Sequence, residues 1–294
     1  MRRRDFITAG MLAAILPGVL AGTRAAAVTA SDPGALLGAL ERRHGGRLGV
    51  AILDTHSGRR IAHRGGERFL MCSTFKVLAV AAILARVDRG HERLERRIAY
   101  GREVLLSHSP VTALHTGAAG LRVDELCAAT IVVSDNAAAN LLLTALGGPQ
   151  AVTAFVRSLG DRQTRLDRTE PTLNVASAGD LRDTITPDAA VDTLRAILLG
   201  NALSASSCAR LLGWMRACET GLDKLRAGLP PGWSAGDKTG SGAQGESNDV
   251  AIAFAPGRSP LLIASYYVAP QVTAAVRAGV LAEVGRIAAS VRGA

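Results

Sequence analysis

Hydrophobic and polar positions follow two different periods along the chain. Residues 32–44 have the spacing of an amphipathic helix, and an apolar run from Ser73 to about Val87 predicts a buried helix that ends before Arg89-Gly90. Helical segments also fill residues 121–159, where Gly147-Gly148-Pro149 is expected to end one helix and start the next.

Alternating or continuously apolar segments predict strands toward both ends of the sequence. These strands are expected at residues 48–54, 60–64, 249–255 and 261–268. Later helices are expected at residues 187–199, 204–217 and 271–291. Strands at both ends with helices between them predict an α+β fold, in which terminal helices close one antiparallel sheet beside a helical lobe.

The polar segment 160–186 shows neither period. A loop of this length inside a compact domain is usually functional, so we expect it to contribute to a site. No internal repeat, linker or low-complexity tract is found, and residues 31–294 are predicted to form one domain.

Composition narrows the class of protein. With 48% hydrophobic and 20% charged residues in 294, the chain is neither a disordered segment nor a polytopic membrane protein. Aromatic residues are only 3%, so the core must rest on Ala, Val, Leu and Ile. The net charge of +9 is dispersed, and no basic stripe with interleaved aromatics is present, which argues against nucleic acid as a partner.

The first 30 residues are predicted to be an export signal. They combine a basic start at Arg2-Arg3-Arg4, an apolar run over residues 11–21 that is too short to span a membrane, and small residues at 25–27. Arg3-Arg4 before Asp5-Phe6-Ile7 resembles the bacterial twin-arginine signal, with ordinary secretion as the alternative. We therefore expect a mature periplasmic or secreted protein without a membrane anchor, starting between residues 28 and 31.

After export the protein would have four cysteines in an oxidising compartment: Cys72, Cys127, Cys208 and Cys218. An even count permits pairing, but residues ten apart on one helix, as Cys208 and Cys218 are predicted to be, lie too far apart for a disulfide. We expect mostly free, buried thiols.

Three short motifs carry the residue types of nucleophilic catalysis. Ser73 and Lys76 lie three positions apart at a predicted helix start, so the amine can exchange a proton with the hydroxyl. Ser134-Asp135-Asn136 precedes an apolar helix, and Lys238-Thr239-Gly240 leads to a predicted strand pair. Each motif alone has an ordinary explanation: a helix cap for the first two, and a β-turn with a solvated lysine for the third.

Together, in this order and spacing, the three motifs resemble the signature of class A β-lactamases and penicillin-binding proteins. The resemblance covers residues 31–294. It implies a five-stranded antiparallel sheet flanked by the terminal helices, beside an all-helical lobe, with the active site between the two lobes. It also implies a monomer that acts on small β-lactam substrates.

The loop 165–174 distinguishes class A β-lactamases from penicillin-binding proteins, because it resembles the omega loop of class A β-lactamases. Glu170 and Asn174 are a carboxylate and an amide that can hold and deprotonate a water beside an ester. The resemblance further implies a salt bridge between Arg168 and Asp183 at the neck of the loop and a cis peptide bond after Glu170.

The resemblance implies a serine acyl-transfer cycle. Ser73 is the nucleophile, and Lys76 and Glu170 are the candidate bases that activate it. Ser134 is expected to pass a proton to the departing lactam nitrogen. The backbone amides of Ser73 and Ser241 are expected to form the oxyanion hole.

Substrate binding is implied for a second set of residues. Asn136 is expected to hold the substrate's side-chain amide, while Lys238, Thr239 and Ser241 receive its carboxylate by charge-assisted hydrogen bonds. No cofactor or metal is expected, because the six histidines have no ligand spacing.

Three positions depart from patterns found in the family. The strand 247–255 lacks the arginine that many members carry, and Lys224 falls where other members supply a substitute arginine; a solvated loop lysine is the alternative. His108 falls where the family often has an aromatic wall at the cleft mouth, and it is expected to stack on substrate. The partner position of a cysteine bridge to Cys72 in one subgroup is occupied by Gly242 here, so that bridge cannot form.

Other functions remain possible at this stage. A DD-peptidase or penicillin-binding protein shares the three motifs and should lack Glu170 and Asn174. A β-lactam sensor would stay acylated and should show a damaged deacylation apparatus, whereas both residues are present.

Overall fold

The computed structural model describes residues 32–175, 177 and 179–291. The expected export signal, residues 1–30, lies outside the described residues.

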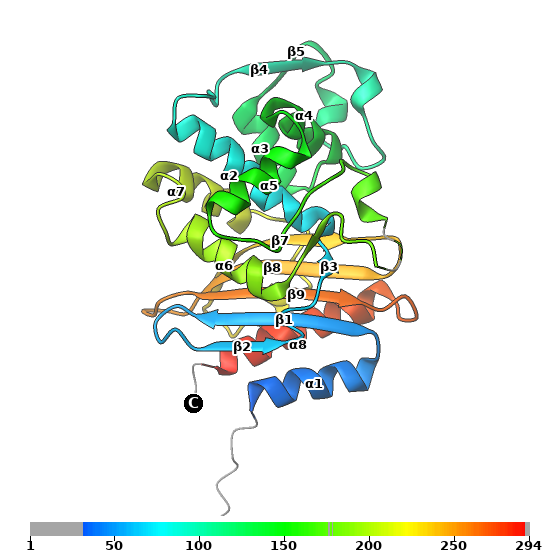
Figure 1. Cartoon of the computed structure of the whole chain (residues 1–294), viewed down its shortest axis with the longest axis vertical. Coiled ribbons are helices and arrows are strands. Elements are labelled where there is room, and N and C mark those ends of the chain that lie inside the picture. The colour runs from blue at the N-terminus through cyan, green and yellow to red at the C-terminus, as the bar shows by residue number, and fades with distance from the viewer. Residues whose placement is uncertain (1–31, 176, 178, 292–294) are drawn as a thin grey trace, which may run out of the picture. The chain divides into compact units, whose positions relative to one another are not determined.

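A five-stranded antiparallel sheet is the framework of this unit (Figure 1). Its strand order is β2-β1-β9-β8-β7. The strands are β1 (Arg47–Asp54), β2 (Arg60–His63), β7 (Ser234–Ser241), β8 (Glu246–Phe254) and β9 (Leu261–Val268). The three inner strands are buried over almost their whole length, in keeping with a sheet covered on both faces.

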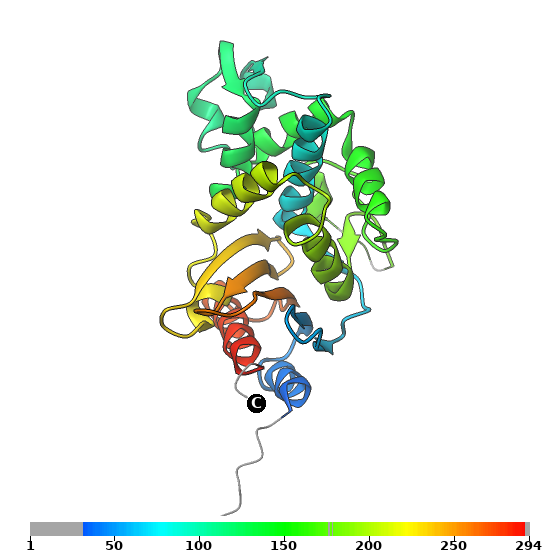
Figure 2. The ribbon, with the colours of Figure 1, turned by 90° about the vertical axis from the view of Figure 1, so that its left-hand side faces the viewer.

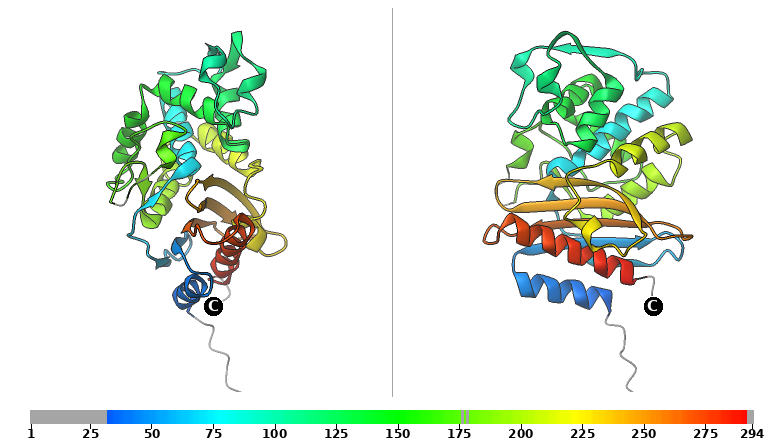
Figure 3. Two further views of the ribbon diagram at one scale, coloured as in Figure 1. Left: turned by 90° about the vertical axis from the view of Figure 1, so that its right-hand side faces the viewer. Right: turned by 180° about the vertical axis from the view of Figure 1, so that it is seen from behind.

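The two terminal helices cover one face of the sheet. Helix α1 (Pro33–His44) and helix α8 (Ala274–Ser290) contact each other and the strands beneath them (Figure 3). Helix α6 (Pro187–Leu198) packs on the opposite face, against β1 and β9 (Figure 2). The predicted α+β fold, with one antiparallel sheet closed by terminal helices, is confirmed.

A helical lobe lies beside β7. Its helices are α2 (Phe75–Asp88), α3 (Val123–Val132), α4 (Asn136–Leu146), α5 (Pro149–Ser158) and α7 (Ala205–Arg216). Two short antiparallel pairs accompany these helices: β3 (Phe69–Leu70) with β6 (Thr184–Ile185), and β4 (Arg97–Tyr100) with β5 (Gly117–Arg122). The 3₁₀ turns are η1 (Cys72–Thr74), η2 (Arg102–Val104), η3 (Thr112–Leu114), η4 (Thr172–Asn174) and η5 (Leu225–Gly228).

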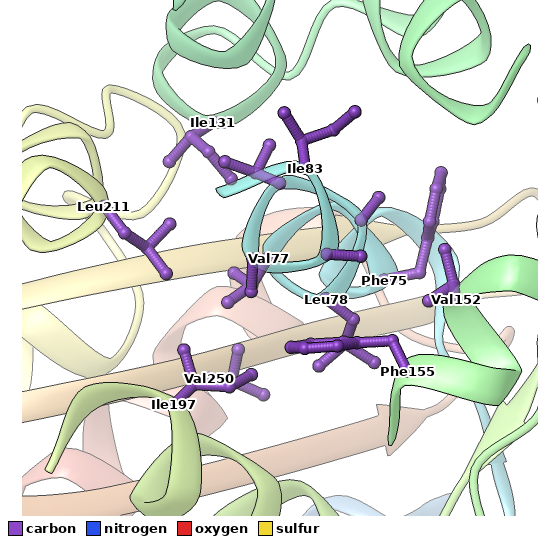
Figure 4. Close-up of a cluster of buried hydrophobic side chains, with 14 of the residues drawn as sticks. Phe75, Val77, Leu78, Ile83, Ile131, Val152, Phe155, Ile197, Leu211 and Val250 are labelled. Carbon is purple, nitrogen blue, oxygen red and sulfur yellow. The ribbon is translucent and has the colours of Figure 1, made fainter. Parts of the chain in front are cut away.

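Helix α2 is the centre of the core. Its residues 75–85 are all buried, because it is apolar around its whole circumference and other elements surround it. Buried side chains from the surrounding elements lie around α2 in Figure 4, including Ile131 of α3, Phe155 of α5 and Val250 of β8. This packing fixes the start of α2, where the predicted nucleophile lies.

The structure corrects three local predictions. Ser73 lies in the 3₁₀ turn η1, and α2 begins only at Phe75. The Lys238 motif is part of strand β7 rather than a turn before a strand pair. Cys218 lies beyond the end of α7, so it does not share a helix with Cys208.

The prediction of mostly free, buried thiols is confirmed. All four cysteines are free thiols. Among the described residues no single helix is long and apolar enough to cross a membrane, and one bent pair, α4 with α5, meets the length and composition criteria jointly.

Candidate active site

A cavity of about 320 Å³ lies between β7 and the helical lobe. It brings together the start of α2, the α3–α4 connection, the long loop and the end of β7. Its lining residues are Ser73, His108, Ser134, Asn136, Glu170, Asn174, Thr220, Lys224, Thr239, Gly240 and Ser241. Nine of these eleven are site residues predicted from the sequence; Thr220 and Gly240 are the additions.

A larger cavity of about 660 Å³ lies at the β1–β2 turn, and its lining also includes a serine, a histidine and an aspartate. There, however, Ser57 Oγ donates to Asp54 Oδ2 (2.9 Å) rather than to His56. Ser57 is exposed, and among the described residues no lysine lines this cavity, whereas Ser73 lies beside the buried Glu170 and Lys76.

Ser73 is presented by a tight turn. The preceding Cys72 has φ of +44°, a left-handed conformation that is uncommon for residues other than glycine and clusters at functional sites. Strand β7 approaches this turn closely: a Cβ on Gly240 would lie 2.9 Å from the Met71 carbonyl oxygen and 3.2 Å from Ser73 N. Glycine at position 240 thus permits this close approach, and Ser73 and Ser241 both line the cavity.

Lys76 lies beneath the cavity floor and is fully buried. Its Nζ donates to Ser134 O (2.7 Å), Ser134 Oγ (3.1 Å) and Asn136 Oδ1 (2.6 Å), and it lies 3.5 Å from Glu170 Oε1. Burial lowers the pKa of Lys76 to about 7, although the Glu170 carboxylate opposes this effect. A lysine with this pKa can exchange a proton near neutral pH.

Ser134 connects the two buried lysines. Its Oγ accepts hydrogen bonds from Lys76 Nζ (3.1 Å) and Lys238 Nζ (3.0 Å). Ser134 also has a left-handed backbone, with φ of +61°. Lys238 is fully buried, and burial lowers its pKa. A serine hydroxyl between two ammonium groups is well placed to pass protons.

Asp135 holds the segment that carries Ser134 and Asn136. It is fully buried and caps α4 by accepting from Ala138 N (2.9 Å). It also accepts hydrogen bonds from the backbone amides of Val111 (3.0 Å) and Thr112 (2.9 Å). The helix-cap explanation of this motif is therefore correct, and it coexists with the position of the two flanking residues in the cavity.

Glu170 is fixed by its side chain and by its backbone. Its Oε1 accepts from Ser73 Oγ (3.3 Å), and its Oε2 accepts from Asn174 Nδ2 (2.6 Å). Asn140 clamps the backbone: its Nδ2 donates to Glu170 O (2.9 Å), and its Oδ1 accepts from Glu170 N (3.0 Å). The peptide bond between Glu170 and Pro171 is cis, as the resemblance implies. Asn140 was not predicted, although it lies one helical turn after Asn136 on the same face of α4.

The neck of the long loop is closed by Asp183, which is fully buried. Its carboxylate pairs with Arg168 Nε (2.5 Å) and accepts from the backbone amides of Asp167 (2.7 Å) and Arg168 (2.9 Å). Its carbonyl accepts from Met71 N (3.0 Å), two residues before the nucleophile. The predicted pair is therefore formed outside the cavity, where it links the loop to the Ser73 turn.

The β7 end of the cavity holds the predicted carboxylate-binding residues. Thr239 and Ser241 line it, and Thr239 Oγ1 forms a 2.6 Å hydrogen bond with Thr220 Oγ1. Lys224 lines the same end with 8% of its surface exposed, so the solvated-lysine alternative is wrong. Thr220 carries no local sequence signal, since it meets Thr239 only through the fold.

Two buried aspartates lie behind these residues. Asp249, opposite Thr239 in the β7–β8 pair, accepts from Leu225 N (3.1 Å). Burial raises the pKa of Asp249 well above its usual range, Asp237 raises it further, and the charge of Lys224 lowers it. Asp237 forms an ion pair with Arg226, and burial raises its pKa as well. The segment carrying Lys224 is thereby tied to the sheet.

His108 lies at the edge of the cavity, as predicted. Its Nε2 is bonded to Val133 O (2.8 Å), and its carbonyl accepts from Asn136 N (2.8 Å). No cluster of three or more His, Cys, Asp or Glu suited to a metal occurs in the part of the chain that the structure describes.

The fold and this cavity define a class of active-site-serine enzymes: a serine at the start of a buried helix, two buried lysines, and a carboxylate held over the serine by a long loop. Comparisons with known proteins are consistent with that class. Residues 35–291 match the family described as the β-lactamase enzyme family.

Individual relatives cover almost the whole chain. A β-lactamase of Streptomyces lavendulae is 48% identical over 266 residues, which cover 89% of this chain and 87% of that protein. β-Lactamase OXY-2 of Klebsiella oxytoca is 45% identical over 94% of this chain and 95% of its own length. The solved structure of an ancestral class A β-lactamase has a TM-score of 0.86 at 57% identity, covering 88% of this chain and 100% of that one.

The chain belongs to the class A β-lactamase family, and the predicted resemblance is confirmed. It is a serine β-lactamase, a hydrolase whose family acts on small β-lactam substrates.

Proposed function

We propose that the protein hydrolyses penicillins and cephalosporins through an acyl-enzyme at Ser73 and a water activated by Glu170. The position of Glu170 carries the proposal, because its carboxylate bonds both Ser73 Oγ (3.3 Å) and Asn174 Nδ2 (2.6 Å). A base in this place can serve the serine in the first half of the cycle and a water in the second.

Acylation begins when Ser73 Oγ attacks the lactam carbonyl carbon. Its proton goes to Glu170, directly or through a water, or to Lys76, whose pKa of about 7 leaves much of the amine neutral at neutral pH. The backbone amides of Ser73 and Ser241 stabilise the oxyanion. The C–N bond then breaks, and Ser134 gives its proton to the nitrogen and regains one from either lysine bonded to it.

In deacylation, Glu170 acts as the base for a water molecule. A water held between Glu170 and Asn174 loses a proton to the carboxylate and attacks the ester carbonyl. The ester C–O bond breaks, and the Ser73 oxygen regains a proton, so that the opened β-lactam acid leaves. Asn140 keeps Glu170 in place during both steps through its two backbone hydrogen bonds.

Binding is assigned to residues around the cavity. Asn136 holds the substrate's side-chain amide, and Thr239, Ser241 and Lys224 receive its carboxylate. Lys238 is buried behind them and adds positive charge at this end of the cavity. His108 packs against the substrate at the cavity edge. Arg168 and Asp183 act at a distance by fixing the loop that carries Glu170.

Steady-state and burst kinetics with a chromogenic cephalosporin test this function. The parent should turn over many equivalents, and Ser73→Ala should lose at least about 10⁴-fold in kcat/KM, since removal of a nucleophile leaves only residual catalysis. A stoichiometric burst followed by silence in the parent would indicate a sensor or a peptidase instead. Sustained turnover by Ser73→Ala would remove the serine from the mechanism.

We also propose that residues 1–30 direct export, so that the domain formed by residues 31–294, with its two lobes, acts as a monomer in the periplasm or outside the cell. The basic and apolar pattern of the leader supports this. Replacing Arg3 and Arg4 by lysines should retain the full-length protein in the cytoplasmic fraction. Unchanged export would favour ordinary secretion.

A further inference from the structure

The distribution of amines in this chain is unusual. Lys76, Lys224 and Lys238 are its only lysines, and every other Lys or Arg position is arginine. Arginine stays charged and does not form Schiff bases at neutral pH, whereas a lysine amine does so readily. The side-chain amine chemistry of the whole protein is therefore concentrated at one cavity.

Two of the three amines are enclosed and fully engaged. Lys76 Nζ makes three hydrogen bonds to Ser134 and Asn136, and Lys238 Nζ donates to Ser134 Oγ (3.0 Å) and Thr239 O (3.0 Å). Both side chains have no exposed surface. Both amines are therefore occupied by protein partners, and neither lysine lines the cavity.

The Lys224 amine differs from the other two. Lys224 lines the cavity, and within the described ranges its Nζ makes no hydrogen bond or ion pair with the protein. Its backbone, in contrast, is held: Lys224 N donates to Gly221 O (3.1 Å), and the next amide, Leu225 N, donates to Asp249 (3.1 Å). A fixed main chain thus presents a lysine that lines the cavity with only 8% of its surface exposed.

The neighbours of this amine favour an anion. Thr239 and Ser241 supply hydroxyl groups at the same end of the cavity, and the buried Lys238 adds positive charge behind them. A carboxylate held there would bring the rest of a small ligand toward Lys224. Charge-assisted hydrogen bonds of this kind are among the stronger polar contacts.

We propose that Lys224 captures small carboxylate-bearing aldehydes as an imine inside the cavity, which makes it a covalent modification site distinct from Ser73. The inference rests on the proposed function in one respect, the carboxylate-binding role of Thr239 and Ser241. The neutral amine of Lys224 adds to the aldehyde carbon, and the carbonyl oxygen becomes a hydroxyl group. Loss of that hydroxyl as water leaves a C=N bond, with no oxidant or reductant required.

The test uses the full-length protein, 4-formylbenzoate as the probe and benzaldehyde as the matched neutral control. Cyanoborohydride traps the imine for intact-mass measurement and peptide mapping. We expect one adduct, on Lys224, that forms at least about tenfold faster with 4-formylbenzoate, because only this probe carries the carboxylate. Equal rates with the two probes, or an adduct confined to the N-terminal amine, Lys76 or Lys238, would overturn the proposal.

Two variants separate this proposal from the hydrolytic function. Lys224→Arg keeps the positive charge but cannot form the imine, so the adduct should be absent in this variant. Circular dichroism checks that the variant folds. If it does not fold, the peptide map of the parent still identifies the modified residue. Ser73→Ala should lose hydrolysis and still form the Lys224 adduct at the parental rate. A loss of labelling in Ser73→Ala would show that the adduct depends on the nucleophile and would contradict the proposal, whereas retained hydrolysis in the same variant would contradict only the proposed function.

Discussion

Glu170 and Lys224 line the same cavity, and they are held in different ways. Glu170 is bonded through both carboxylate oxygens and, by Asn140, through both backbone atoms. The backbone around Lys224 is fixed, but its amine has no partner among the residues described. The comparison indicates that Glu170, on the proposed proton-transfer side, is held in place before substrate binds. On the carboxylate-binding side, the Lys224 amine has no partner in the described part of the chain and can bind a charged group of the ligand.

Removing the hydrogen bonds that hold Glu170 should have the largest effect on catalysis. Asn140→Leu removes the two hydrogen bonds that hold the Glu170 backbone, so the carboxylate should move away from Ser73 and from the hydrolytic water. We expect kcat to fall about a hundredfold, the loss that a misplacement of about 1 Å can cause. Single-turnover kinetics should place this loss in deacylation. The exposed Asn201→Leu serves as the matched control, and an equal loss in both variants would contradict the clamp.

A pH profile sharpens the role assigned to Lys76. Burial lowers the pKa of Lys76 to about 7, and the Glu170 carboxylate opposes this, so Glu170→Gln should move the midpoint below 7. If neutral Lys76 accepts the Ser73 proton in this variant, the acylation rate should fall about tenfold per pH unit below the midpoint and level off above it. Stopped-flow acylation from pH 5 to 8 measures this, with the exposed Glu219→Gln as control. A pH-independent rate would exclude Lys76 as the base.

Removing the unpartnered charge should have a moderate effect. Lys224→Met should raise KM about tenfold, the size expected for one charge-assisted hydrogen bond, and change kcat much less. Lys224→Arg should retain most of the affinity, since the charge remains. Steady-state kinetics with a penicillin and a cephalosporin would decide this, and an unchanged KM in Lys224→Met would show that Lys238, Thr239 and Ser241 suffice.

The smallest effect is expected at Thr220, a positioning residue. Thr220→Val removes the hydroxyl that bonds Thr239 Oγ1 at 2.6 Å, so the Thr239 hydroxyl can rotate away from the substrate. We expect a two- to threefold rise in KM, about the size of one neutral hydrogen bond. Thr220→Ser restores the hydroxyl and should restore KM. A failure of serine to rescue would indicate that packing of the methyl group matters instead.

Most of the fold could be predicted from the local sequence. Helix α2 could be predicted because residues 77–85 form a continuous apolar run, and β9 because it is mostly apolar. Strand β7 could not be predicted from the hydrophobic pattern, because its sequence is polar. Its buried Asp237 pairs with Arg226, and its buried Lys238 donates to Ser134, which is far away along the chain. Charged residues inside a sheet give no local signal of burial.

The candidate site shows the same division. Residues in short motifs, such as Ser73 and Lys76, could be recognised because their spacing is local. Asn140 and Thr220 could not, because their partners, Glu170 and Thr239, are about 20 to 30 positions away and meet them only in the folded protein. The lack of a partner for the Lys224 amine among the described residues could not be predicted either, because it depends on which groups the fold places near that amine.

The measurement that tests the mechanism most directly is the mass of the Glu170→Gln variant during reaction with a cephalosporin. If Glu170 activates the deacylating water, the variant should accumulate a covalent adduct that peptide mapping places on Ser73, and the adduct should persist at least about a hundredfold longer than in the parent. The parent should show the adduct only transiently. A variant that turns over at the parental rate, or an adduct on any other residue, would contradict the mechanism.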